Sequence, residues 1–265
     1  MSESLDAFFV EALFIHPIKS CAPVSVPRLD FTHEGRVVGD RQWAVVEDGG
    51  MSWMGAHPRL ALVRPEFSGD RLVINSGLAS VPLEAPREEI QIRIWNDVSK
   101  ENEVHGAFDA GDEAAAALRE ITGADLRLVK LGPSAITLTA PRALHVFTRA
   151  SVEEVQRRWG HAVDPLRFRP NVLLGSETPL AFIEEQVARL TWAEGRLLIS
   201  EPCVRCIMPN VDPRDASVDE ALGHTVAAMS AERKPGGPSL FGVYAQIEAG
   251  TSLSVGTRLD VELAF

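Results

Sequence analysis

The chain has 265 residues, of which 45% are hydrophobic, and it carries a formal net charge of −11. This length is enough to bury a sizeable core in one or two domains. The acidic balance disfavours nucleic acid and anionic lipid as partners, because both would be repelled by most of the surface. No apolar run approaches the roughly 20 residues of a membrane helix, and acids stand where a signal peptide would be basic. We therefore expect a soluble, cytoplasmic protein with no nucleic-acid or membrane partner.

Short predicted strands dominate the first 105 residues. The segments VSVPRLDF, RQWAVVED, LALVRPEF, RLVINS and IQIRIW are β-branched or alternating, and turn residues bound them. In the last of these, Ile90, Ile92 and Ile94 would share one face of a strand. Such spacing predicts a barrel or sandwich rather than alternating βαβ units.

Helices are predicted at three places further along the chain, over residues 111–123, 151–160 and 217–229. The first is alanine-rich and ends at a glycine. The other two open with capping boxes that begin at Ser151 and Ser217. Strands fill most of the remaining sequence, including a hairpin that turns at Glu194-Gly195.

The best linker candidate is LGPSAITLTAPRA, residues 131–143. We therefore expect two domains, over residues 1–132 and 133–265. The fold class is mainly β with a few helices: a β-rich N-terminal domain followed by a second β-barrel domain.

Two of the three cysteines lie in EPCVRCIMPNVDP, residues 201–213. A zinc site would need two more ligands, and the chain has no second Cys-x-x-C and no closely spaced histidine pair. A thioredoxin-type redox pair needs a helix at the cysteines, which Pro209 would interrupt. Two buried structural thiols, or one thiolate favoured by the neighbouring Arg205, remain as alternatives.

Three other short stretches offer groups that bind anions. These are HPIKS, GDR and RFRPN, each placed next to a predicted strand. Arginine presents a planar fork to phosphate and lysine presents a point charge. The side chains concerned are Lys19, Ser20, Arg41, Arg167, Arg169 and Asn171.

Together these stretches resemble one known family. EPCVRCIMPNVDP is similar to the signature of MOSC domains, and LFIHPIKSC, GRVVGDRQWAVVEDGG, RFRPNVLL and FGVYAQI are similar to further blocks of its two-domain members. Those members include the mitochondrial amidoxime-reducing components and the bacterial YcbX-type proteins. The resemblance runs in order over residues 10 to 262.

The resemblance implies that a molybdopterin-type molybdenum cofactor binds between the two domains. Cys206 would be the protein ligand of the metal, with Cys203 supporting it and Val204 and Arg205 lining the site. Asp212 would lie near the open face of the metal, where it could relay a proton. Positions that match cofactor-holding residues of the family are Lys19, Ser20, Arg41, Thr148, Arg149, Arg169 and Asn171.

The implied reaction is the reduction of N-hydroxylated compounds such as amidoximes and hydroxylamines. No fused ferredoxin domain follows the MOSC-like block, so we expect electrons from a separate donor protein of ferredoxin or flavoprotein type. The chain reads DPRDAS where the family usually continues Asp-Pro-x-Thr-Gly, which could alter the substrate side of the loop. The alternative function is a molybdenum-cofactor carrier or sulfur-transfer module without reductase turnover.

Overall fold

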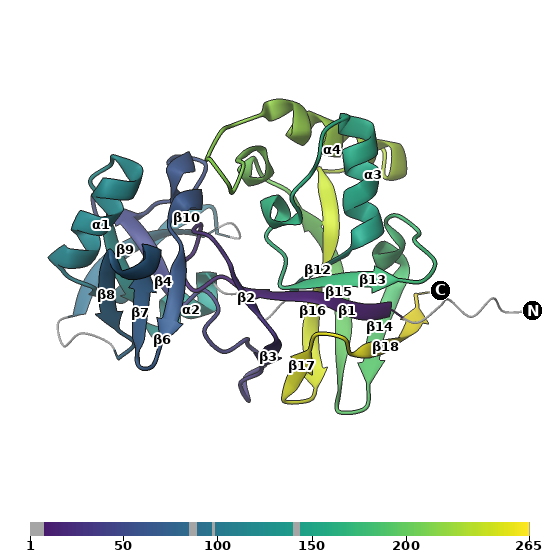
Figure 1. Ribbon diagram of the computed structural model, residues 1–265, viewed down its shortest axis with the longest axis horizontal. Coiled ribbons are helices and arrows are strands. Elements are labelled where there is room, and N and C mark those ends of the chain that lie inside the picture. Colours follow the sequence, from purple (N-terminus) through teal and green to yellow (C-terminus); the bar gives the residue numbers. More distant parts are fainter. Residues whose placement is uncertain (1–7, 85–88, 97–98, 140–143, 265) are drawn as a thin grey trace, which may run out of the picture.

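A computed structural model describes residues 8–84, 89–96, 99–139 and 144–264 of the chain. The molecule consists of two β-rich lobes side by side, and helices cover parts of each (Figure 1). The expectation of a mainly β protein built on barrels is confirmed. No helix among the described residues is both long enough and apolar enough to cross a bilayer.

The N-terminal lobe is a five-stranded closed barrel with a three-stranded sheet beside it. The barrel runs β10-β11-β4-β5-β9, and the small sheet runs β6-β7-β8. The strands are β4 (Trp43–Glu47), β5 (Gly50–Met51), β6 (Pro65–Ser68), β7 (Arg71–Ile74), β8 (Ala79–Pro82), β9 (Glu89–Asn96), β10 (Glu101–Asp109) and β11 (Arg127–Leu131), and the helices are α1 (Asp112–Thr122) and α2 (Pro133–Thr139).

The C-terminal lobe is a sheet that closes on itself. Its order is β13-β12-β16-β15-β14-β18-β1-β2, and β1 also pairs with β13, which completes a ring. A small sheet of β17 and β3 lies beside it. The strands are β1 (Phe8–Ile15), β2 (Val24–Val26), β3 (Arg28–Asp30), β12 (Leu144–Thr148), β13 (Val172–Ser176), β14 (Val187–Trp192), β15 (Gly195–Val204), β16 (Leu240–Ala249), β17 (Ser252–Ser254) and β18 (Arg258–Leu263), and the helices are α3 (Arg149–Trp159) and α4 (Glu220–Arg233).

The first three strands do not follow the expected division at residue 132. β1 crosses to the C-terminal lobe, where it lies between β13 and β18 (Figure 1). Its alternate side chains Phe8, Val10 and Leu13 are buried in the core of that barrel. Apolar burial therefore fixes β1 in the C-terminal lobe, and the chain enters the N-terminal lobe only afterwards.

Local sequence signals account for most of the helices and strands. Ile92 and Ile94 are buried in the N-terminal barrel with Ile90 packed beside them, as alternation predicts. Helix α1 is followed by the C-cap Gly123, whose φ of 77° is left-handed and favours glycine because glycine has no side chain to clash. The predicted hairpin turns between β14 and β15, with Trp192 opposite Gly195.

Two helix predictions and the linker prediction need correction. Helix α3 begins two residues early, because the Thr148 side chain accepts the Ser151 backbone N–H and caps it. Helix α4 begins at Glu220, because Asp219 accepts from the Ala221 backbone N–H in place of the expected Ser217 cap. The proposed linker contains helix α2, which packs against β10 and β11.

Candidate functional site

A turn after β1 carries the first predicted site residues. The backbone N–H of Lys19 donates to the carbonyl of Trp43 at 2.8 Å, and that of Arg41 donates to the carbonyl of His16 at 2.8 Å. Ser20 is buried and has φ 67°, and Arg41 has φ 50°. The two left-handed residues mark sharp turns, and the structure brings Lys19, Ser20 and Arg41 onto neighbouring segments.

Asn171 links this turn to the C-terminal barrel. Its amide nitrogen donates to the carbonyl of Phe14 at 3.1 Å, and its amide oxygen accepts from Arg41 Nη1 at 3.4 Å. Asp40 ion-pairs with Arg41 and accepts the backbone N–H of His16 at 2.7 Å. Arg41 and Asn171, predicted separately from distant segments, are therefore in contact.

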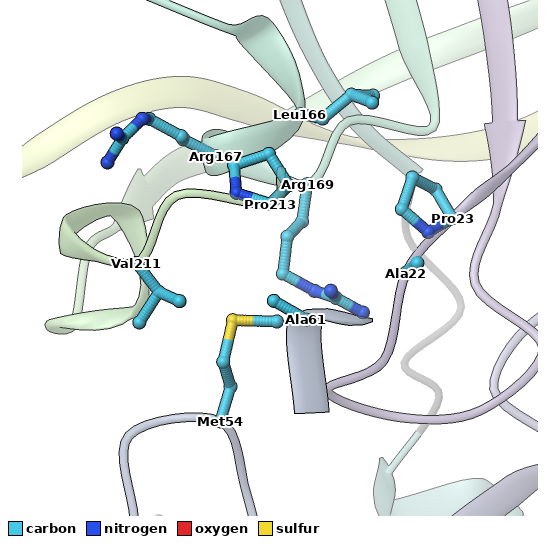
Figure 2. Close-up of a pocket in the computed structure, with 9 residues that line it drawn as sticks. All are labelled: Ala22, Pro23, Met54, Ala61, Leu166, Arg167, Arg169, Val211 and Pro213. Atoms are coloured by element: carbon cyan, nitrogen blue, oxygen red, sulfur yellow. The ribbon is translucent and has the colours of Figure 1, made fainter. Parts of the chain in front are cut away.

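Arg169 is buried between the lobes. Its side chain extends toward Ala22 and Ala61 (Figure 2), and its Nη1 donates to the carbonyl of Cys21 at 2.6 Å. Burial, together with the charge of Arg41, lowers the pKa of Arg169 to about 10. The cavity beside it has a volume of about 10 Å³, which is room for about one water molecule.

Arg205 completes a cluster of three arginines with Arg41 and Arg169. Its charge and that of Arg41 both act to lower the pKa of Arg169. It donates from Nη2 to the carbonyl of Phe168 at 3.1 Å and from Nη1 to the sulfur of Cys203 at 3.1 Å. The cluster gathers positive charge in a protein that is acidic as a whole, and Asp40 offsets part of it by pairing with Arg41.

The two motif cysteines have opposite environments. Cys203 is buried, while Cys206 is exposed, as are its neighbours Val204 and Ile207. Burial raises the pKa of Cys203, but His145 and Arg205 outweigh it and hold that pKa below its ordinary value. Cys206 is thus the thiol that is open to a ligand, and Cys203 is the one that is held in the protein.

Asp212 is not placed as an open proton relay. It is buried, and its carboxylate accepts from Arg167 Nη2 at 2.6 Å and from Arg214 Nη2 at 2.7 Å. Arg214 and Arg167 hold the pKa of this carboxyl well below its usual range, although burial opposes them. Arg167 also donates to the carbonyls of Pro209 and Asn210, so the pair fastens the loop after Cys206.

Thr148 and Arg149 contact residues outside the arginine cluster. The Thr148 hydroxyl donates to buried Glu184 at 3.0 Å, and Arg149 pairs with Glu11 on β1. Both lie at the end of β12. His145 lies near the start of that strand, where its backbone N–H donates to Asn171, which also accepts from Arg41. Three residues of strand separate these positions by about 10 Å.

Four residues that contact the site were not among the predicted site residues: Asp40, His16, His145 and Tyr244. From the sequence, His16 is either a pocket-lining residue or, as we expected, a strand-edge residue. Asp40 and His16 stand inside the GDR and HPIKS blocks, so the blocks themselves were the available signal. His16 is fully buried, and burial with Arg169 and Arg41 lowers its pKa well below 6.5. His145 had the pattern of a core residue, which it is, and nothing local connects it or Tyr244 to Cys203.

Comparison with known proteins identifies the family of the chain. Residues 7–125 match the MOSC N-terminal beta barrel domain, and residues 131–260 match the MOSC domain. The chain is 30% identical to mitochondrial amidoxime reducing component 2 of Rattus norvegicus over 93% of its own length and 81% of the relative. The chain belongs to the MOSC-domain family.

The chain covers a different fraction of each of two kinds of relative. Mitochondrial amidoxime reducing component 2 of Bos taurus is 29% identical, with 93% of this chain and 81% of that protein covered. Molybdenum cofactor sulfurase of Drosophila grimshawi is 27% identical, with 88% of this chain covered. The chain spans only 31% of the length of that sulfurase, and 81% of the amidoxime-reducing component.

The family implies a molybdenum cofactor, and the buried polar atoms of the site show whether its residues fit such a group. Within the described residues, His16 Nδ1 and Arg205 Nε are buried polar atoms without a hydrogen-bond partner. His16 Nε2 donates to the carbonyl of Pro170 at 3.0 Å, so Nδ1 is a free acceptor in the neutral ring. The cationic cluster and the unpaired Arg205 donor fit an anionic part of such a group, and the His16 acceptor fits an N–H or O–H donor on it, so that these bonds would offset the burial of the polar atoms.

Proposed function

We propose that this MOSC protein is a molybdenum-dependent reductase of N-hydroxylated compounds such as amidoximes and hydroxylamines. The observation that carries the proposal is the exposed Cys206 next to Arg205, which belongs to an arginine cluster centred on the buried Arg169. A thiolate is a suitable protein ligand for molybdenum, and clustered guanidiniums suit the phosphate of a molybdopterin. The named amidoxime-reducing relatives, which the chain matches over most of their length, support the substrate class.

Each part of the site has a proposed task. Arg41, Arg169 and Arg205 would hold the anionic end of the cofactor, together with Lys19, Ser20 and Asn171. Cys206 would anchor the metal, and the Arg167–Asp212 pair keeps the loop that carries this cysteine in place. When bound, the cofactor supplies the two-electron chemistry that the side chains lack. A separate donor protein would supply the electrons.

The test is turnover of benzamidoxime by molybdenum-loaded protein, with reduced methyl viologen as the electron source. We expect formation of benzamidine by the wild type and none by Cys206→Ser. Loaded wild-type protein that forms no benzamidine would overturn the reductase proposal. The chemical reductant matters, because it removes the need to know the donor protein.

The sulfurase relatives favour a second candidate function, in which the protein carries the cofactor or sulfur without turnover. The buried Cys203, paired to Arg205, is the residue that supports it, since a thiolate is the form of cysteine that accepts and passes sulfur. Mixing the loaded protein with a molybdenum enzyme that lacks cofactor separates the two. Activation of that enzyme, without benzamidoxime turnover, would favour the carrier.

A further inference from the structure

A second cationic region lies on the outer side of the loop that follows Cys206. It is an open groove of about 540 Å³, where the N-terminal lobe meets Arg214 of the C-terminal lobe. Cys206 does not line it, and none of the three clustered arginines of the proposed cofactor site does. The groove is therefore a separate feature of the surface.

Three arginines from two segments line this groove: Arg59 and Arg64 from one, and Arg214 from the other. Arg59 donates from Nε to the carbonyl of Ile121 at 2.8 Å, which orients the side chain without neutralising it. Within the described residues no carboxylate pairs with Arg59 or Arg64, and both residues are exposed. The backbone of Arg64 is itself fixed, because its N–H donates to Asn75 Oδ1 at 2.7 Å.

The nearby acids leave the groove positive. Asp212 pairs with Arg214 but shares its charge with the buried Arg167. Glu120 is the carboxylate that lines the groove itself. Asp164 and Asp215 also attract Arg214, so, among the described residues, the charge of the groove left without an acidic partner is that of Arg59 and Arg64, beside Glu120. Such a concentration of cations attracts anions, and the planar fork of arginine suits a carboxylate or a phosphate in particular.

The floor of the groove is apolar. Leu62, Leu78 and Ile121 line it, and Leu78 is 36% exposed. A volume of this size is in the range of small-molecule sites, which combine apolar walls with a few polar groups that fix orientation. A simple inorganic ion would leave the exposed Leu78 in water, so the lining favours a ligand with an apolar part.

We propose that this groove binds a small organic anion, in which a carboxylate or phosphate contacts Arg59 and Arg64 and an apolar body covers Leu78. Arg214 joins the groove to the loop after Cys206, because the same guanidinium that lines the groove holds Asp212. The site is chemically distinct from the proposed cofactor site, since its arginines are exposed and its ligand would exchange with solvent.

The test is calorimetric titration of the purified protein with benzoate and with phenyl phosphate at fixed ionic strength. We expect saturable binding of one probe or both, about ten-fold weaker in Arg64→Gln, since one charge-assisted pair is lost. Arg64→Lys, which keeps the charge but not the fork, should bind with intermediate affinity. Arg258→Gln is the matched control, because Arg258 is an exposed arginine on β18, paired with Glu177.

Several outcomes would overturn the proposal. One is the absence of saturable binding of either probe up to about 10 mM, a concentration that would detect even weak sites. Another is binding that Arg169→Gln abolishes and Arg64→Gln leaves intact, which would place the probe in the buried cluster. Inorganic phosphate that binds as tightly as phenyl phosphate would contradict the role of the apolar floor. Thermal unfolding of each variant verifies that it is folded.

Discussion

Arg205 donates a hydrogen bond to the sulfur of Cys203 at 3.1 Å, while Cys206, which follows Arg205 in the chain, is exposed to solvent. Two cysteines three positions apart are thereby given different reactivities. Exposure controls access by a reagent, whereas the arginine controls only the charge of the buried sulfur. Which cysteine reacts first is therefore a direct test of the site geometry.

We predict that iodoacetamide modifies Cys206 of the metal-free native protein well before Cys203 or Cys21, both of which are buried. Trypsin cleaves after Arg205, so the two motif cysteines fall in separate peptides, residues 197–205 and 206–214. Mass spectrometry of those peptides over time gives each rate. In denaturant all three cysteines should react. Faster labelling of the 197–205 peptide in the native protein would contradict the placement.

Substitution of the exposed cysteine tests the metal ligand. For Cys206→Ser we expect about one molybdenum per chain to fall towards zero, because a hydroxyl is a poor replacement for thiolate. The free energy of unfolding of the metal-free protein should change by less than about 0.5 kcal/mol, since the site is on the surface. Metal analysis checks the molybdenum content, and thermal unfolding checks the stability. Full metal content in the variant would remove Cys206 from the metal site.

The resemblance assigns both Arg169 and Arg149 to the cofactor site, but the structure places them in different surroundings. Arg169→Gln removes a buried cation from the cluster, so bound molybdenum should fall several-fold. Arg149→Gln is the matched control, because Arg149 pairs with Glu11 at the far end of β12, and its cofactor content should stay near that of the wild type. Phosphorus and molybdenum analysis of both proteins is the measurement. Equal losses in the two variants would favour the resemblance over the geometry.

Asp212→Asn should destabilise the protein by about 3 kcal/mol, because it leaves the buried Arg167 without its counter-charge. The folded pKa of Asp212 is depressed, so its stabilising contribution is present above the unfolded pKa and is lost as pH falls below about 3.9. Chemical denaturation at pH 7 and at low pH measures both effects. A break in the pH–rate profile near neutrality that disappears in this variant would restore the proton-relay role.

Glu184 gives the opposite pH dependence. Burial raises its pKa from 4.5 to about 6, although Ser151 and Thr148 donate to it. The folded state then binds the proton more tightly than the unfolded state, so this group costs stability as pH rises from about 4.5 to 6, by about 2 kcal/mol in all. Glu184→Gln should lack that slope. The measurement is the difference in unfolding free energy between wild type and variant across this range, and a constant difference would be the contrary result.

Local patterns predicted the elements better than they predicted partnerships. Alternation identified the buried face of β9, and Gly123 identified the end of α1, because each depends on neighbours in sequence. The caps of α3 and α4 were misplaced, since several residues near each start could accept the same N–H. Helix α2 was missed because a short Pro-initiated segment shows too little periodicity to separate it from a loop.

The candidate site shows the same division. Arg41, Arg169 and Asn171 could be chosen by residue type and by resemblance, but the contacts of Arg41 with Asn171 and of Arg169 with Cys21 depend on how distant segments meet. The burial of Asp212 could not be inferred either, because its partner Arg167 comes from a distant segment. Long-range pairing of this kind leaves no periodic mark in a single sequence.

The position of β1 has a consequence for how the protein matures. Phe8 lies opposite Leu259, so β1 is paired with a strand that is synthesised much later. Pairing across almost the whole chain is slow, because a long loop must close before its contacts form. The turn with Lys19 and Ser20 follows β1 directly, and its anchorage depends on that closure. We therefore expect any cofactor that uses this turn to bind only after β18 has been synthesised and paired with β1.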